Sequence, residues 1–349
     1  MSSAKSLTWS HGVVSVESLG GMLGPTLFVL EDGRQIAPFH IAPWFESHQS
    51  SALPGILQRL RGEWPCVPFG AASHRASHDG WPASDPALES DQFPHGYGSN
   101  HKWRWLEAAE NEIALEIDYP DSHPISKLQR RVKPVVGKAA IDFVLSIEVR
   151  RDCALPIGLH PIFRLPAQTG GMSLDIRAKA GCTFPGQVDS SSIFDPNQVA
   201  QDWHCIALRD GTTLNPSAVP LSQKTEDLLQ LLDVRGHAEL RNLTEGYRIQ
   251  LDWNAEHFPD LLLWFSNCGR KHAPWNGRHL ALGVEPVCSA FDLGNQISSS
   301  PNPINAHGNP TARVFHSGEL FETRYRVTLD TIPAVEAALP RLNHIGLGK

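Results

Sequence analysis

The sequence predicts an all-β protein whose strands are mainly antiparallel. Three observations carry this prediction. Apolar and polar residues alternate with a period of two along several stretches, as in strands with one buried face. Glycine and proline are frequent, with 28 and 27 residues, and many of them separate these stretches. Patterns with helical spacing are scarce, so we expect only a few short helices.

The clearest strand spans residues 141–149, where Ile, Phe, Leu, Ile and Val occupy alternate positions. Because successive side chains of a strand point to opposite faces, this pattern predicts one buried and one exposed face. The same alternation marks residues 247–254 and 321–329. Shorter examples are residues 113–117 and 26–30.

Turn residues separate the predicted strands. Four short segments that contain glycine lie between strand-like stretches, and each is predicted to form a hairpin connection. They are Glu31–Gly33, Val135–Lys138, Thr244–Gly246 and Ser317–Glu319. Such connections favour antiparallel neighbours, in agreement with the predicted class.

Two short stretches, Pro54–Arg61 and Pro333–Leu339, are the helix candidates. Residues 70–100 lack a clear period and are rich in Ser, Pro, His and Asp. Loops of that length in a compact domain are usually functional or mobile. No change of composition marks a linker, so we expect a single domain over residues 1–349.

Composition excludes several classes of function. The net charge is −7, so the chain lacks the excess of basic residues that is typical of proteins that bind nucleic acid. No apolar stretch is long enough to span a membrane, and the first residues lack the apolar core of a signal peptide. The six cysteines form no C-x-x-C pair, which argues against a structural zinc site or a redox motif. We expect a cytoplasmic monomer or homodimer with free thiols.

Tryptophan is frequent, with ten residues against four tyrosines. Flat indole faces can stack on sugar rings, although most tryptophans fill cores and sheet faces. The excess is therefore compatible with carbohydrate binding without predicting it.

Polar residues in four segments stand beside glycine or proline. These residues are Arg61 in Arg-Gly-Glu-Trp-Pro, His95 in Pro-His-Gly-Tyr-Gly, His160 in Gly-Leu-His-Pro and Glu285 in Gly-Val-Glu-Pro. A rigid kink at a strand end fixes the direction of a side chain, which suits a catalytic group. Each motif alone is common, and a histidine beside proline is more often structural. Their joint order along the chain is more informative.

That order resembles the aldose 1-epimerase (galactose mutarotase-like) superfamily. The shared pattern is R-G-x-x-P-x-x-x-F-G, H-G-Y, G-x-H-P-x-F-R, E-D-L and G-x-E-P, over roughly residues 55–295. The nearest likeness is to the branch that includes hexose-6-phosphate mutarotases. The resemblance implies a large antiparallel β-supersandwich with a few short helices. It also implies an isomerase that interconverts the α and β anomers of an aldohexose.

The resemblance implies roles for individual residues. Glu285 matches the base that takes the proton of the anomeric hydroxyl, and His160 matches the acid that protonates the ring oxygen. Three further residues match positions that bind the sugar: His95, Asp227 and Arg61. Asp233 is the alternative to Asp227.

The implied chemistry requires little besides these side chains. Two groups that exchange protons with the sugar need no metal, nucleotide or covalent intermediate. The sequence also has no phosphate loop, dinucleotide glycine pattern or zinc spacing. We therefore expect no cofactor and no metal, and a small sugar as the partner.

One position departs from the hexose-phosphate branch. Ser99 stands where that branch carries an arginine that helps to hold the phosphate. Serine cannot offer the planar, forked donor that arginine gives a phosphate, so a neutral sugar is favoured. Other cations keep a phosphorylated substrate open: Lys102, Arg104, Arg75 and Arg164.

Three other functions stay open. His74 and His78 have the spacing of a metal pair on a helix, although the surrounding Ser, Gly and Pro favour a loop. A glycoside hydrolase would need two carboxylates, for which Glu285 and Asp227 are the candidates. A sugar-binding protein without activity would not need both His160 and Glu285.

Overall fold

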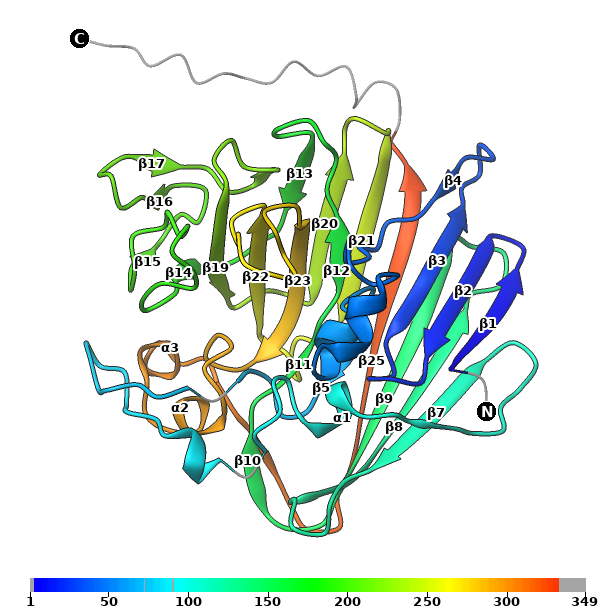
Figure 1. Ribbon diagram of the computed structural model, residues 1–349, viewed down its shortest axis with the longest axis horizontal. Coiled ribbons are helices and arrows are strands. Elements are labelled where there is room, and N and C mark those ends of the chain that lie inside the picture. Colours follow the sequence, from blue (N-terminus) through cyan, green and yellow to red (C-terminus); the bar gives the residue numbers. More distant parts are fainter. Residues whose placement is uncertain (1–2, 72, 90, 333–349) are drawn as a thin grey trace.

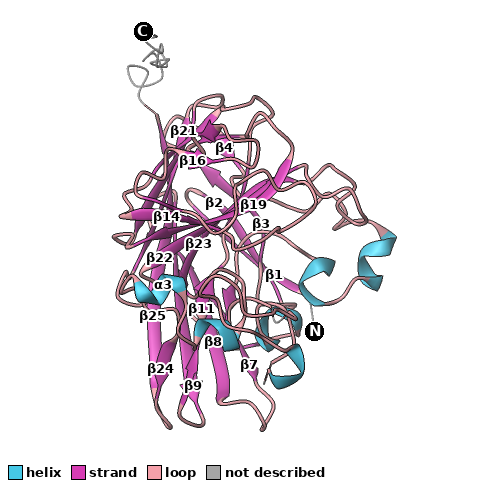
Figure 2. Cartoon of the chain, turned by 90° about the vertical axis from the view of Figure 1, so that its left-hand side faces the viewer, coloured by secondary structure: helices cyan, strands magenta, loops and turns pink. Residues whose placement is uncertain are grey.

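The computed structural model describes residues 3–71, 73–89 and 91–332 of the chain. Two large antiparallel sheets face one another, and a smaller sheet lies beside them (Figure 1). Seen from the side, the strands form stacked layers with loops and short helices at one flank (Figure 2). The predicted all-β sandwich is confirmed. The helix candidate Pro333–Leu339 lies outside the described residues.

The first large sheet has nine strands, each antiparallel to its neighbours. In spatial order they are β18 (Ala218–Val219), β13 (Met172–Asp175), β20 (His237–Asn242), β21 (Tyr247–Trp253), β25 (Leu320–Thr331), β9 (Ala140–Val149), β8 (Ile125–Pro134), β7 (Ile113–Asp118) and β6 (Arg104–Trp105). Strands β9, β21 and β25 bury alternate residues. The sequence period of two predicted all three.

The second large sheet has eight strands. They are, in order, β15 (Val199–Ala200), β14 (Ala180–Thr183), β19 (Thr225–Leu232), β22 (Asp260–Asn267), β23 (Leu280–Cys288), β11 (Ile157–Leu159) and β5 (Pro65–Cys66), with β12 (Ile162–Arg164) also paired to β23. Every residue of β19 and β22 is buried, because other parts of the protein pack against both faces of this sheet. Strands buried on both faces do not alternate in sequence, which explains why these two were not predicted.

Smaller elements complete the chain. A four-stranded sheet contains β1 (Ala4–Trp9), β2 (Gly12–Glu17), β3 (Leu23–Val29) and β4 (Gln35–Ile36). Two further sheets have two strands each. One pairs β10 (Cys153–Leu155) with β24 (Arg313–Phe315), and the other pairs β16 (Ile206–Ala207) with β17 (Thr213–Leu214). The helices are η1 (His48–Ala52), η2 (Gly55–Gln58), η3 (Pro86–Leu88), α1 (Tyr97–Asn100), α2 (Asn295–Ser298) and α3 (Pro303–Ala306). The predicted helix over residues 54–61 is thus a single 3-10 turn. No helix in the described ranges has the length and apolarity to cross a bilayer.

Three of the four predicted hairpin connections are confirmed. Residues 31–33 join β3 to β4, residues 135–138 join β8 to β9, and residues 244–246 join β20 to β21. The prediction for Ser317–Glu319 is wrong, since β24 pairs with β10 while β25 pairs with β9 and β21. This turn leads the chain from one sheet into another.

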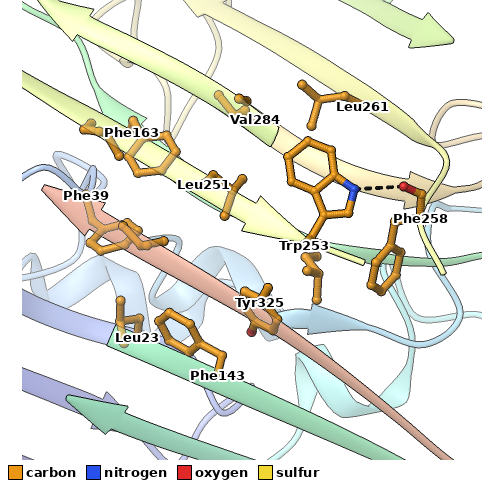
Figure 3. Packing of buried hydrophobic residues seen from close by; sticks show 14 of the residues in the cluster. Leu23, Phe39, Phe143, Phe163, Leu251, Trp253, Phe258, Leu261, Val284 and Tyr325 are labelled. Carbon is orange, nitrogen blue, oxygen red and sulfur yellow. Dashed lines mark hydrogen bonds between the residues drawn. The ribbon is translucent and has the colours of Figure 1, made fainter. Parts of the chain in front are cut away.

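The main core fills the space between the two large sheets (Figure 3). Phe143 and Tyr325 stack with ring centroids 4.7 Å apart, and Leu261 reaches this core from the opposite sheet. Buried Trp253 donates its indole N–H to the carbonyl oxygen of Phe258 at 2.8 Å. The polar atom of this large side chain is therefore satisfied inside the core.

A second apolar cluster covers the other face of the eight-stranded sheet. Side chains of β19, β22 and β23 pack there against residues from the segments before and after β5. Trp44 and Trp64 are buried in this cluster, together with Trp264 from β22. This layer covers one face of the eight-stranded sheet, and the candidate site lies between the layer and that face.

Candidate active site

Strand register brings His160 and Glu285 together. Gly158 pairs with Val287 and Ile162 pairs with Gly283, so His160, which lies between β11 and β12, stands opposite Glu285 of β23. His160 Nδ1 lies 3.5 Å from Glu285 Oε1. Both side chains are almost fully buried, and neither of these atoms has a hydrogen-bond partner in the described part of the chain.

These two side chains line a cleft of about 120 Å³. Its lining combines five polar residues with aliphatic and indole side chains. The lining residues are Ile56, Leu57, Leu60, His95, His160, Val188, Leu228, Leu262, Trp264, Arg270, Trp275, Glu285 and Asp292. A concave site with an apolar wall and a few convergent polar groups is typical of small-molecule binding.

Burial controls the protonation of the pair. It lowers the pKa of His160 well below its usual value, and the neighbouring His95 acts in the same direction. Burial also raises the pKa of Glu285 well above its usual value, with a smaller contribution from the charge of Asp292. Removal from water disfavours both charged forms, so burial favours the state in which the pair holds one shared proton.

His95 lies at the edge of the same site. Its ring centroid is 4.9 Å from that of His160, with the rings nearly perpendicular. The backbone N–H of Gly70 donates to His95 Nδ1 at 3.4 Å, which leaves the ring proton on Nε2. Burial lowers the pKa of His95 to about 4, so this ring is neutral at pH 7. It can donate one hydrogen bond to a hydroxyl.

Asp292 is a second carboxylate in the cleft. It follows β23 and is half-buried, and its backbone oxygen accepts from the N–H of Ala71 at 2.8 Å. Burial raises the pKa of Asp292, while the charges of Arg75 and Arg270 oppose that rise. Its carboxylate places hydrogen-bond acceptors in the cleft near Glu285.

Arg270 is the cation of the described cleft lining, and it is held in place. Its Nε lies 3.4 Å from Glu226 Oε1, and its guanidinium lies 4.6 Å from the ring centroid of Trp275. Glu226 also accepts from Trp264 Nε1 at 2.5 Å and from Ser266 Oγ at 3.0 Å. Burial raises the pKa of Glu226 to about 7, against the opposing charge of Arg270.

Asp227 is not among the described residues that line the cleft. Leu228 of β19 lines the cleft, so Glu226 shares its face and Asp227 points the opposite way. The Asp227 carboxylate accepts from the backbone N–H of Ile193 at 2.9 Å and from Thr225 Oγ1. It holds a loop against the strand, and burial raises its pKa to about 6.

The alternative aspartate does not reach the cleft either. Asp233 is exposed just beyond β19, and its backbone N–H donates to Asp260 Oδ1 at 3.0 Å. Arg61 likewise is not among the described residues that line the cleft. Its guanidinium is buried against Glu17, at 2.6 Å, and lies over the ring of Phe45. Of the five residues implied by the resemblance, the structure brings three together.

Ser99 cannot contact a substrate from its position. The side chain is fully buried, and its hydroxyl donates to the backbone oxygen of His95 at 2.6 Å. Arg164 forms a forked ion pair with Glu245, with both distances 2.6 Å. Arg104 pairs with acidic side chains of β7. These side chains have structural partners away from the cleft.

His74 and His78 lie on an exposed loop. Their side chains are 79% and 77% exposed. His74 Nδ1 is 3.6 Å from Asp85, and His78 Nε2 is 2.8 Å from Asp79. Each histidine thus faces an acidic side chain and solvent, and the predicted loop is confirmed.

Sequence reasoning missed five polar or aromatic residues of the site: Glu226, Trp264, Arg270, Trp275 and Asp292. Glu226 and Trp264 stand in strands that are buried on both faces, where the sequence does not show which residue faces which side. The high tryptophan count was the available signal, and Trp264 and Trp275 both line the cleft.

Comparisons with known proteins bear on the fold. No family model matches the chain, and neither does any curated protein. Solved structures do match it. A proposed aldose 1-epimerase from Escherichia coli K12 superposes with a TM-score of 0.63 at 13% identity, covering 94% of this chain and 99% of that one.

Two further structures resemble the chain to a similar extent. A galactose mutarotase-like protein from Lactobacillus casei gives a TM-score of 0.57 at 13% identity, covering 93% of this chain and 99% of that one. A GalM/aldose epimerase homologue from C. elegans gives 0.58 at 11% identity, covering 95% of this chain and 100% of that one. Such similarity extends over nearly the whole length. The chain therefore has the fold of the aldose 1-epimerase and galactose mutarotase-like proteins.

Proposed function

We propose that this protein is an aldose 1-epimerase that interconverts the α and β anomers of an aldohexose. The observation that carries the proposal is the pair of His160 and Glu285, whose facing atoms lie 3.5 Å apart in a buried cleft. Neither atom has another hydrogen-bond partner among the described residues, so both are free to bond to a substrate. The shared fold supports the same reaction class.

The reaction follows from two proton transfers. The Glu285 carboxylate takes the proton of the anomeric hydroxyl while His160 gives a proton to the ring oxygen, and the bond from C1 to the ring oxygen breaks. Rotation about C1–C2 in the open-chain aldehyde presents the other face of the carbonyl. Reversal of both transfers closes the ring as the other anomer. The two side chains end with the protons they began with.

The pair holds its one proton in either of two forms. In one form His160 is neutral and Glu285 is protonated; in the other His160 is cationic and Glu285 is ionised. The second form supplies a base for the hydroxyl and an acid for the ring oxygen. The two forms differ only by transfer of the proton between Nδ1 and Oε1, across 3.5 Å.

Other cleft residues fit the binding of a sugar. The indole rings of Trp264 and Trp275 line the cleft and offer flat faces to the C–H groups of a pyranose. His95 presents its Nε2–H as a donor, and Asp292 presents acceptors. A sugar hydroxyl is both donor and acceptor, so it can pair with either group.

The charges of the cleft favour an uncharged aldohexose. Glu285 and Asp292 are acidic, and Arg270 already pairs with Glu226. A phosphate dianion would enter a site without a free forked donor in its described lining. We therefore propose a free sugar, rather than its 6-phosphate, as the substrate.

Anomer exchange measured by NMR tests the proposal. Freshly dissolved α-glucose and α-galactose should reach anomeric equilibrium faster with the protein than in buffer alone. Glu285→Gln should remove the acceleration and leave sugar binding nearly intact, since the amide keeps the shape and loses the base. Glu322→Gln, on the exposed face of β25, is the control and should leave the rate unchanged. Binding without acceleration of any sugar would favour a sugar-binding protein instead.

A further inference from the structure

The proposed acid of the reaction lies where a positive charge is poorly solvated. The titratable groups that approach the two proton-sharing side chains are His95 from the loop, Cys66 from β5 and Asp292 after β23. His95 disfavours a charge on His160, and Cys66 is a neutral thiol because burial raises its pKa well above its usual value. Among the described residues, Glu285 provides the carboxylate that pairs with the ring, at 3.5 Å. A group that favours the cationic form of His160 would therefore draw the shared proton from Glu285 to His160.

Trp64 is stacked on the imidazole. The ring centroids of Trp64 and His160 are 4.2 Å apart and the planes are inclined by 17°, so the indole face covers the imidazole. The backbone N–H of His160 donates to the carbonyl oxygen of Trp64 at 2.9 Å. The neighbouring residues Pro65 and Leu159 are paired between β5 and β11. Backbone and ring contacts therefore hold the two residues in one fixed arrangement.

The other described aromatic neighbours of His160 stack less closely than Trp64, and Phe69 is tilted by 35° with its ring centroid 6.3 Å away. His95 and Trp264 meet His160 nearly edge-on, at 81° and 83°. An aromatic face carries negative electrostatic potential and attracts a cation above it, with tryptophan the strongest of the three aromatic side chains. The attraction is larger when water is excluded, and Trp64 is fully buried. It acts on the protonated imidazole more than on the neutral one.

We propose that Trp64 is a positioning residue for the acid/base pair, which fixes the plane of the His160 ring and draws the shared proton from Glu285 to His160. The proton leaves Glu285 Oε1 and binds His160 Nδ1, giving a carboxylate and an imidazolium without change in total charge. Trp64 thereby selects the form of the pair that can open a sugar ring. This step rests on the proposed function only for its use in catalysis, since the proton position is a property of the free protein.

Histidine titration by 15N NMR tests the proposal without any sugar. A His160→Gln spectrum identifies the signal of His160 in the full-length protein. In Trp64→Leu the pKa of His160 should fall by about one unit, because a desolvated cation–π contact is lost. In Trp64→Phe it should fall by less, since the phenyl face is weaker. An unchanged titration of His160 in these variants would overturn the proposal.

A matched variant and a second measurement keep the result unambiguous. Trp203 is also buried, and its ring centroid lies 4.2 Å from that of His204 with the planes tilted by 33°, but it belongs to the core between the sheets. Trp203→Phe should leave the His160 titration unchanged, and an equal shift in it would overturn the proposal. If Trp64→Leu does not fold, as judged by near-UV circular dichroism, the titration of His160 in Trp64→Phe alone decides.

Kinetics provide the second measurement. Where the wild-type protein exchanges anomers, Trp64→Phe should lower kcat and leave KM unchanged, whereas the reverse pattern would contradict a positioning role. Absence of exchange in the wild-type protein refutes the proposed function and leaves the titration test intact.

Discussion

Gly283 and Glu285 lie two positions apart on β23, and the glycine provides the space that the glutamate occupies. A Cβ atom at Gly283 would stand 2.1 Å from Glu285 Oε1, far inside van der Waals contact. Successive odd positions of a strand share a face, so the carboxylate folds back over the position that a side chain would take. The orientation of the proposed base therefore depends on a residue that cannot itself take part in chemistry.

Gly283→Ala is expected to abolish most anomer exchange. The added methyl group displaces the carboxylate from His160, and a misplaced base loses about 10²–10⁴-fold in rate. The measurement is kcat for anomer exchange, beside a thermal melt to show that the protein folds. Full activity in the folded variant would mean that the reaction does not depend on this position of Glu285.

Asp292→Asn is expected to move the alkaline limb of the activity profile to lower pH. The charge of Asp292 helps to raise the pKa of Glu285, after the larger effect of burial. Removing that charge lowers the pKa of Glu285, so the shared proton leaves the pair at a lower pH. Activity needs one proton on the pair and is lost above the pH at which that proton dissociates.

The pH dependence of kcat/KM checks this expectation. The wild-type profile should be bell-shaped, and its acid limb should lie below the usual pKa of histidine because burial lowers that of His160. Asp233→Asn is the matched control, since that aspartate is exposed and lies outside the cleft lining. An alkaline limb that stays in place in Asp292→Asn would show that Asp292 has no influence on the pair.

Replacing the carboxylate by an amide should have different effects at Glu226 and Asp227, which are neighbours on β19. Glu226→Gln is expected to weaken sugar binding by about tenfold, because Arg270 and Trp264 lose the carboxylate that orients them. Asp227→Asn should leave KM unchanged and lower the free energy of unfolding by about 1–3 kcal/mol, because its partners are backbone N–H groups of a loop. Kinetics and urea denaturation distinguish the two. Interchanged effects would mean that the faces of β19 are assigned the wrong way round.

Free aldohexoses should be better substrates than their 6-phosphates. A phosphate loses charge-assisted hydrogen bonds worth about 1.5–3 kcal/mol each when no free forked donor meets it, so kcat/KM should fall by about tenfold or more. The comparison requires equal concentrations and fixed ionic strength, since charged ligands respond to salt. Faster exchange of the phosphates would assign the protein a sugar-phosphate substrate. Ser99→Arg should not rescue the phosphates, because Ser99 is buried beneath His95.

The sequence by itself was sufficient for the fold class and for the strands that bury one face. In β9 and β25 the alternation of apolar and polar residues records directly which side meets the core. The proximity of His160 and Glu285 was also expected, because both stand beside proline in segments whose order resembles the superfamily. Antiparallel pairing then makes the sum of paired residue numbers constant along β11, β12 and β23, which sets the two opposite each other.

Only the tertiary structure decided which residues complete the cleft. Strand β19 is buried on both faces, so Glu226 and Asp227 have equivalent surroundings in sequence, and only the packing of Leu228 shows which faces the site. The stack of Trp64 on His160 joins residues almost one hundred positions apart in the chain, and no local pattern encodes it. The period of two in a strand identifies the buried face when the other face is exposed to solvent. When both faces are buried, only the residues packed against each face show which side chains point where.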